Sequence, residues 1–371
     1  MLNNYNPSFS GFSPDRWVEK TWRGYSYRVW RPYMPKMPSI LSSCVFYIYP
    51  SEDDAKNSTE YGGTGFFFGV ESEYTDWVHC YAVTNVHIVF RNGMENPVIR
   101  INTKDNKFDT IKTSRDEWIR HPAGDDVAIC PFEFRSRNMD IGYLVKDGIA
   151  DENFLKEFSV GVGDDIVMTG RFRVHAGKER NHPVLRFGNI AAMNDEPISN
   201  NFTQLQQESY LVEMRSISGF SGSPVFIFIN PLSSPRQLDS SKNMISGTFP
   251  NFKIIYQIKL LGIQWGQISY MTTAKDTGDQ SYKIGVDSAM EGVVPIQKLM
   301  DLIYSEEMIQ MREKENKKRN NNLMGIDDEK SSFILTTNDN ENIELTQEKV
   351  EDVLKKIAHP LKPNGQEKKG M

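Results

Sequence analysis

Residues that could carry chemistry stand at three separate places in the sequence. Ser221 lies between two glycines in the stretch SGFSGSPVF. A serine hydroxyl is a poor nucleophile at neutral pH, so a base must take its proton. His87, in the β-rich stretch AVTNVHIVF, could be that base. Asp126, which opens the stretch DVAICPF, could orient the imidazole and stabilise its charged form.

Two of these choices have structural alternatives. Ser221 could be a turn residue ahead of a buried strand, because glycine on both sides is typical of turns. His79 competes with His87, since it lies eight residues earlier in the same β-rich region. It stands in the middle of an apolar run, which favours a packed or surface histidine over a base.

Five segments together resemble a known family. The segments GGTGFFF, AVTNVHIV, DDVAI, SGFSGSPVF and LLGIQWGQ follow one another in the order and approximate spacing of the chymotrypsin-like (trypsin-like) serine proteases. The likeness is closest to the disulfide-free bacterial branches, including the glutamyl endopeptidases. It spans roughly residues 41–295, and leaves both termini unexplained. The serine segment is the most specific, and the combination is far more specific than any one piece.

The resemblance implies a role for each residue. His87 is the general base and acid, Asp126 orients it, and Ser221 is the nucleophile. The backbone N–H groups of Gly219 and Ser221 form the oxyanion hole, where glycine suits an inward-pointing amide that a β-carbon would often obstruct. Asp126 is preferred over Asp125 because it directly precedes Val-Ala-Ile, as in the family's pattern.

The elements that must position these residues read as strands. Short runs rich in Val, Ile, Phe, Tyr and Thr recur between about residues 41 and 295, separated by glycine and polar clusters. Such a series favours barrels or a sandwich over a parallel α/β sheet. The resemblance implies an all-β fold of two packed antiparallel six-stranded β-barrels, at about 41–150 and 151–295. The first barrel would supply the histidine and aspartate, and the second the serine.

The two ends of the chain have a different character. Residues 1–40 are rich in aromatic residues, arginine and proline, which predicts a segment that wraps over the larger domain without regular structure. Helical spacing predicts a C-terminal helix over residues 296–318. Residues 319–371 predict a polar linker, then a small α+β tail with a hairpin and a short helix.

Composition bounds the partners and the compartment. Lys and Arg number 43 against 49 Asp and Glu, so the net charge of -6 does not favour a general nucleic-acid binder. The three cysteines, Cys44, Cys80 and Cys130, form neither a disulfide framework nor a zinc pattern, which favours a reducing compartment. The N-terminus lacks a secretory pattern, and no stretch predicts a membrane span. We therefore expect a cytoplasmic protein without a metal or cofactor.

Substrate contacts follow from the same resemblance. The strand that contains Gln264, Trp265 and Gly266 would pair with an extended substrate backbone. Glutamyl endopeptidases have a histidine where Gln264 stands, and this departure weighs against a preference for glutamate. Arg215 lies six positions before Ser221 and would favour an acidic or polar substrate side chain if it reached the pocket. The alternative is that Arg215 points to solvent.

Regulation and function leave alternatives open. Phe220 stands where many secreted relatives have an aspartate that pairs with a newly cut N-terminus, so activation of that kind is not expected. Control would come from loop ordering, the N-terminal segment, the C-terminal tail or a partner, and the hypothesis is a regulatory protein partner that binds the N-terminal segment or the tail. The leading interpretation is a serine endopeptidase acting on protein or peptide substrates. The alternatives are a catalytically silent binding or scaffold protein, disfavoured by the complete set of three residues, and an esterase on the same triad.

Overall fold

The computed structural model describes most of the chain. It covers residues 17–22, 25–30, 37–60, 62–72, 77–91, 94–134, 136–193, 196–214, 219–229, 257–275, 281–323, 332–336 and 342–346. The chain divides into two compact units, Met1–Ser305 and Glu306–Met371. The chemistry-bearing residues all belong to the first unit.

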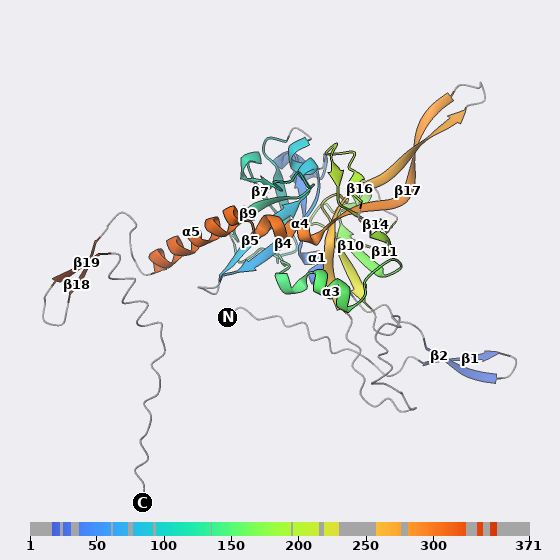
Figure 1. The fold of residues 1–371 in the computed structure, drawn as a ribbon, viewed down its shortest axis with the longest axis horizontal. Coiled ribbons are helices and arrows are strands. Elements are labelled where there is room, and N and C mark those ends of the chain that lie inside the picture. Colours follow the sequence, from blue (N-terminus) through green and yellow to red (C-terminus); the bar gives the residue numbers. More distant parts are fainter. Residues whose placement is uncertain are drawn as a thin grey trace, which may run out of the picture. The chain divides into compact units, whose positions relative to one another are not determined.

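A seven-stranded antiparallel sheet forms the first half of the fold (Figure 1). Its strands lie in the order β7-β6-β3-β4-β5-β9-β8, and β7 and β8 at its edges do not pair with each other within the described residues. The bounds are β3 Val45–Tyr49, β4 Gly63–Glu71, β5 Val78–Thr84, β6 Val98–Asn102, β7 Phe108–Lys112, β8 Ile119–Arg120 and β9 Ala128–Phe132. We call this sheet the half-barrel.

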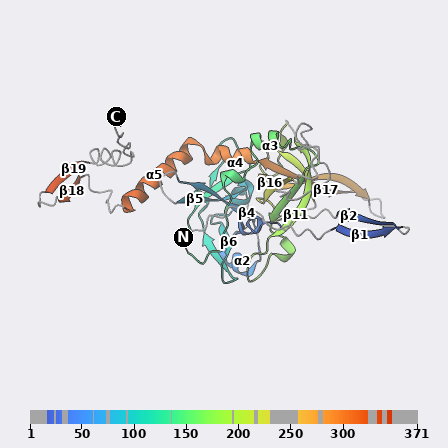
Figure 2. The same ribbon diagram turned by 90° about the horizontal axis from the view of Figure 1, so that it is seen from below.

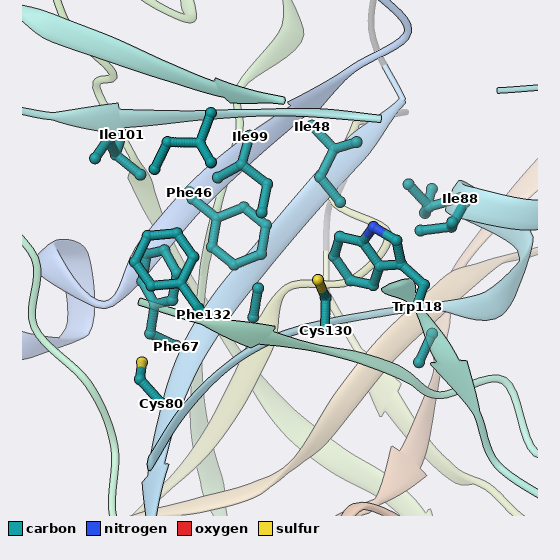
Figure 3. Close-up of a cluster of buried hydrophobic side chains, with 14 of the residues drawn as sticks. Phe46, Ile48, Phe67, Cys80, Ile88, Ile99, Ile101, Trp118, Cys130 and Phe132 are labelled. Carbon is teal, nitrogen blue, oxygen red and sulfur yellow. The ribbon is translucent and has the colours of Figure 1, made fainter. Parts of the chain in front are cut away.

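Aromatic side chains fill the core of the half-barrel. The rings of Phe46 and Phe67 lie 4.7 Å apart between centroids, and Phe67 and Phe132 lie 4.5 Å apart (Figure 3). Burial of one such side chain stabilises a fold by about 1.5–3 kcal/mol. Gly65 on β4 is required by this packing, because a β-carbon there would lie 2.2 Å from the Phe46 ring.

A closed six-stranded antiparallel barrel forms the second half, in the order β10-β11-β14-β17-β16-β15. The bounds are β10 Asp165–Gly170, β11 Val184–Met193, β14 Tyr210–Glu213, β15 Pro224–Ile229, β16 Gln257–Lys275 and β17 Ser281–Pro295. The half-barrel and the closed barrel confirm the predicted chymotrypsin-like class. The half-barrel has seven strands where six were expected, because the two-residue strand β8 adds to its edge.

Strands β16 and β17 continue beyond the barrel as a two-stranded hairpin (Figure 1). Strand β15 pairs with β16 only as far as Ile263, and β14 pairs with β17 only as far as Met290. The pairing between β16 and β17 nevertheless continues to Lys275 and Ser281. The hairpin therefore grows directly out of the strand that contains Gln264.

The described residues contain further strands and helices. They are β1 Trp17–Trp22, β2 Tyr25–Trp30, α1 Ile40–Ser43, α2 Glu52–Asn57, α3 Glu152–Glu157, β12 Ile198–Ser199, β13 Gln206–Gln207, α4 Ile296–Ile303, α5 Glu306–Leu323, β18 Ser332–Thr336 and β19 Asn342–Thr346. Helix α4 follows β17 and lies beside β16 (Figures 1 and 2).

The terminal segments differ in part from their predictions. Strands β1 and β2 pair as a hairpin in a segment predicted to lack regular structure, because its prolines at 32, 35 and 38 come after both strands. The predicted helix over 296–318 is two helices, α4 and α5. Strands β18 and β19 form the predicted tail hairpin. The short helix predicted after them lies outside the described residues.

A buried arginine joins the two halves of the fold. Arg100, on β6, is fully buried and donates to the hydroxyl of Ser58 at 2.6 Å. Its guanidinium also donates to the carbonyls of Gly177 at 3.1 Å and Lys178 at 2.5 Å, in the loop between β10 and β11. Several charge-assisted hydrogen bonds offset the cost of burying the charge, so Arg100 fixes the half-barrel against the closed barrel.

Candidate active site

Two neighbouring strands of the half-barrel bring His87 and Asp126 together. Strands β5 and β9 pair in register, with Thr84 opposite Ala128. His87 follows the end of β5 and opens a π-helical turn, His87–Arg91, while Asp126 comes two residues before β9. Both side chains therefore emerge at the same edge of the sheet.

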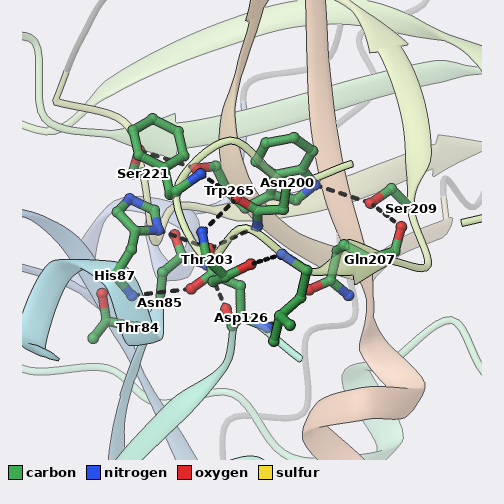
Figure 4. A network of polar contacts seen from close by, with 12 residues as sticks. Thr84, Asn85, His87, Asp126, Asn200, Thr203, Gln207, Ser209, Ser221 and Trp265 are labelled. Carbon is green, nitrogen blue, oxygen red and sulfur yellow. Dashed lines mark hydrogen bonds and ion pairs between the residues drawn. The ribbon is translucent and has the colours of Figure 1, made fainter. Parts of the chain in front are cut away.

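The two side chains form a buried pair. His87 Nδ1 lies 2.7 Å from Asp126 Oδ2, and the backbone N–H of His87 donates to Asp126 Oδ1 at 3.0 Å (Figure 4). His87 is 5% exposed and Asp126 is fully buried. A carboxylate in this position holds the imidazole in the tautomer that carries its proton on Nδ1, which leaves Nε2 able to accept a proton.

Three further residues hold Asp126 in place. Asn200 Nδ2 donates to Asp126 Oδ2 at 3.2 Å. Gln207 Oε1 accepts the backbone N–H of Asp126 at 2.8 Å, and Asn85 Nδ2 donates to its backbone carbonyl at 2.7 Å. Asn200 and Gln207 come from the small hairpin β12–β13, whereas Asn85 lies between β5 and His87. Asp126 is thus held from both halves of the fold.

The loop that contains Ser221 leads into β15 and docks on β4. Thr64 donates its backbone N–H to the carbonyl of Ser221 at 2.9 Å and its hydroxyl to the carbonyl of Gly219 at 2.8 Å. Gly219 has φ +112° and Gly222 has φ +87°, values that favour glycine. A β-carbon at Gly222 would also lie 2.0 Å from the carbonyl oxygen of Thr64. The glycines therefore allow the close approach that brings Ser221 to the half-barrel.

The Ser221 hydroxyl is hydrogen-bonded to Trp265 in this structure. Its Oγ donates to the carbonyl of Trp265 at 3.3 Å. Within the described residues it makes no hydrogen bond to His87, although both side chains belong to the same network (Figure 4). The backbone N–H groups of Gly219 and Ser221 donate to no partner in the described part of the chain.

Phe202 covers the imidazole. Its ring stacks on His87 with 4.3 Å between centroids and an interplanar angle of 12°, and it makes a T-shaped contact with Trp265 at 6.4 Å between centroids. A β-carbon at Gly266 would lie 2.4 Å from the Phe202 ring. Phe202 thus occupies the space above both the imidazole and the strand at 264–266.

The predicted substrate strand is already bonded within the protein. Gln264 accepts the N–H of Gly222 at 2.8 Å and donates its own N–H to Ser223 at 2.9 Å. Its side chain is buried and donates to Glu291 Oε2 at 2.5 Å. Trp265 Nε1 donates to Ser209 Oγ at 2.9 Å. Arg215, the predicted pocket residue, lies outside the described residues.

Asp125 belongs to a neighbouring polar cluster that shares Gln207 with the Asp126 site. Its Oδ2 lies 3.0 Å from His121 Nδ1 and 3.6 Å from Lys298 Nζ, and its Oδ1 accepts Gln207 Nε2 at 2.7 Å. Burial raises the pKa of the Asp125 carboxyl, but His121, Lys298 and Gln207 together outweigh burial and hold the pKa below its usual value. Asp125 thus supports the Gln207 side chain that contacts Asp126.

Asp125→Asn is expected to show a stability difference that depends on pH. A carboxyl whose folded-state pKa is lowered contributes stability above its unfolded pKa, and this contribution is lost as the pH falls through the folded-state pKa. The variant should therefore melt roughly 2 °C below the wild type at pH 7, with the gap narrowing below about pH 4. Thermal unfolding at several pH values measures this. A gap independent of pH would contradict it.

The described residues offer little to a metal. They contain no group of three or more His, Cys, Asp or Glu side chains placed to hold an ion. The three cysteines are buried free thiols. Burial raises the pKa of each thiol, that of Cys130 to about 12, so none favours the thiolate that binds metals or attacks substrates. No helix in the described part of the chain has the length and apolar character needed to span a membrane.

Sequence reasoning missed three residues of this site, Asn200, Phe202 and Gln207. The stretch ISNNFTQLQQ stands out only as a run of Asn, Gln and Thr around one phenylalanine. Such a run is typical of an ordinary polar loop. The missing information is the long-range contact, since Asn200 lies 74 positions from Asp126 in the sequence.

Comparisons with known proteins give structural likeness only. No family model matches the sequence, and no curated protein matches it. Among solved structures, the MamO protease domain from Magnetospirillum magneticum (apo form) is 13% identical with a TM-score of 0.41, covering 71% of this chain and 96% of that one. An inactive serine-to-alanine mutant of Rv3671c from M. tuberculosis is 13% identical with a TM-score of 0.36, covering 72% and 94%.

A third structure is an inactivated protease paralogue of the scabies mite. It is 12% identical with a TM-score of 0.37, and the match covers 75% of this chain and 98% of that one. The strand pairings of the chain itself, and not these scores, establish its fold.

Proposed function

We propose that this protein is a serine endopeptidase that hydrolyses peptide bonds through an acyl-enzyme. The observation that carries the proposal is the buried His87–Asp126 pair, at 2.7 Å, beside a glycine-flanked serine loop docked on the same sheet. An imidazole oriented by a buried carboxylate is the base that a serine nucleophile needs.

In the proposed mechanism each of these groups has one role. Ser221 Oγ attacks the carbonyl carbon of the substrate while His87 Nε2 takes the hydroxyl proton. Asp126 stabilises the resulting imidazolium, and the N–H groups of Gly219 and Ser221 bind the oxyanion. His87 then gives the proton to the leaving amine. The amine departs, and the acyl-enzyme remains. Water, deprotonated by His87, hydrolyses this ester and restores the serine.

Two rearrangements precede the reaction. The Ser221 hydroxyl must exchange its hydrogen bond to Trp265 for one to His87. The Phe202 ring must move away from Gly266 if a substrate strand is to reach 264–266. Both are side-chain or loop motions, and hydrogen bonds of this kind often tighten only when substrate binds. A regulatory partner could favour the rearranged state.

The hydrogen bond of Ser221 to Trp265 and the Phe202 ring over His87 also favour a second candidate function. A protein whose serine bonds a carbonyl, and whose histidine is covered by an aromatic ring, could serve as a non-catalytic binding protein on a protease fold. The two functions differ in whether Ser221 reacts. An esterase would also react, so the peptide bond itself must be tested separately.

A fluorophosphonate probe separates the two functions, because it bonds covalently to a serine that an adjacent base activates. We expect the purified wild type to be labelled on Ser221, and Ser221→Ala to show no labelling. Ser223→Ala is the matched control, since its hydroxyl is two residues away and fully buried. It should be labelled like the wild type.

The readout is intact-protein mass spectrometry followed by peptide mapping. Labelling of Ser221 supports the enzyme, and cleavage of a peptide library by wild type but not by Ser221→Ala distinguishes a peptidase from an esterase. An unlabelled wild type with native melting behaviour would favour the binding protein.

A further inference from the structure

We propose that Asn200 is a positioning residue for the His87–Asp126 pair, an inference that rests on the proposed function. Its amide donates to Asp126 Oδ2, the same oxygen that faces His87 Nδ1. Asn200 is fully buried, so its bond to the carboxylate is not exchanged with water.

The carboxylate of Asp126 has a small set of donors. Oδ1 accepts the backbone N–H of His87, and Oδ2 accepts His87 Nδ1 and Asn200 Nδ2. Asn200 is therefore the one side chain outside His87 that hydrogen-bonds this carboxylate within the described residues (Figure 4). A second donor on Oδ2 fixes the rotation of the carboxylate and so fixes the direction in which His87 is held.

The other face of the Asn200 amide orders the loop above the site. Its Oδ1 accepts the backbone N–H groups of Phe202 at 2.8 Å and Thr203 at 3.2 Å. The backbone of Asn200 also bonds Gln204 and Leu205. One amide therefore joins the turn that places Phe202 on the imidazole to the carboxylate that orients the same imidazole.

The oxygen and the NH₂ group of the Asn200 amide have separable effects. Asparagine commonly accepts backbone N–H groups in turns, and this needs only its oxygen. Contact with Asp126 needs the NH₂ group. Asn200→Asp keeps the turn acceptor and the shape of the side chain, but replaces the donor with a second carboxylate oxygen about 3 Å from Asp126, where two carboxylates cannot both remain freely ionised.

The first measurement is the rate of fluorophosphonate labelling. We expect Asn200→Asp to slow labelling of Ser221 by about 10- to 100-fold, because a second carboxyl beside Asp126 either repels its charge or shares a proton with it, and each case weakens the hold of Asp126 on His87. Asn201→Asp is the matched control, because it makes the same substitution with the same charge change at the next residue, which is exposed. It should label within about twofold of the wild type.

The second measurement does not depend on activity. The proton shared between His87 Nδ1 and Asp126 should give a downfield NMR resonance that is absent from His87→Ala. In Asn200→Asp the resonance should shift or disappear, whereas Asn201→Asp should leave it in place. A residue that only ordered the turn would leave this resonance unmoved.

The outcomes decide the inference in each case. An unchanged resonance and a labelling rate within twofold of the wild type in Asn200→Asp would overturn it. If the wild type is not labelled at all, the proposed function fails and the resonance alone decides the role of Asn200. If Asn200→Asp does not fold, Asn200→Ser replaces it, because serine can still cap the turn but is too short to reach Asp126. Asn200→Ser is then expected to shift the resonance and to slow labelling in the same way.

Discussion

Replacing His87 with alanine is expected to lower kcat for peptide hydrolysis by roughly a million-fold. Without the imidazole, no described side chain is placed to take the Ser221 proton, and the leaving amine loses its acid. Removal of a triad base costs about as much as removal of the whole triad, because the members act as a unit. KM should change little, since the imidazole contributes mainly to the transition state. Initial rates on a peptide identified by library cleavage measure this.

His175→Ala is the control for this experiment. His175 is exposed in the loop between β10 and β11 and forms no part of the network around Asp126. It should keep kcat within about threefold of the wild type. Both variants need melting temperatures close to the wild type for the comparison to hold. A His87→Ala enzyme that retained more than about a tenth of the wild-type kcat would exclude His87 as the base.

The sequence was informative where residue types and the order of the strands are enough to predict the structure. His87, Asp126 and Ser221 each adjoin a recognisable apolar run, and a strand pairing brings the first two together. The double-barrel class was also predictable, because β-branched and aromatic runs separated by glycine have few other arrangements. These features depend on local composition and on the order of segments.

The sequence was uninformative where contacts are long-range and polar. Gln207 lies 81 positions from Asp126, and nothing in its neighbours marks it as a partner of a buried aspartate. Phe202 reads as one loop phenylalanine among many, and its stacking on His87 depends on how the β12–β13 hairpin folds back. An amide can accept or donate anywhere, so its residue type does not identify its partner.

The lengths of the strands and helices could also not be predicted from the sequence. Strands β16 and β17 run far past the barrel, although their outer halves mix Thr, Tyr, Lys and Ser without a clear apolar alternation. The pairing of each strand with the other provides the backbone hydrogen bonds that local composition does not reveal. The break between α4 and α5, at Tyr304 and Ser305, likewise falls inside one continuous helical pattern.

Asp126→Asn is expected to lower kcat by about ten-thousand-fold while leaving the fold intact. The amide has the shape of the carboxylate, but it cannot accept both His87 hydrogen bonds and the bond from Asn200. Where its NH₂ group faces His87 Nδ1, the imidazole must carry its proton on Nε2, so it cannot take the proton of Ser221. The change also removes the negative charge that stabilises the imidazolium. Steady-state rates at pH 7 to 8, with the peptide used for His87→Ala, give the size of the loss.

Asp125→Asn is the matched control, because it makes the same substitution one residue earlier in the chain. Asp125 faces His121 and Lys298, not His87, and it reaches the Asp126 site only through Gln207, so its loss should affect melting more than turnover. We expect Asp125→Asn to keep kcat within about fivefold of the wild type. Equal losses in the two variants would mean that the negative charge of the whole Asp125–Asp126 region matters and not the bond to His87. A large loss in Asp125→Asn alone would transfer the orienting role to the neighbouring carboxylate.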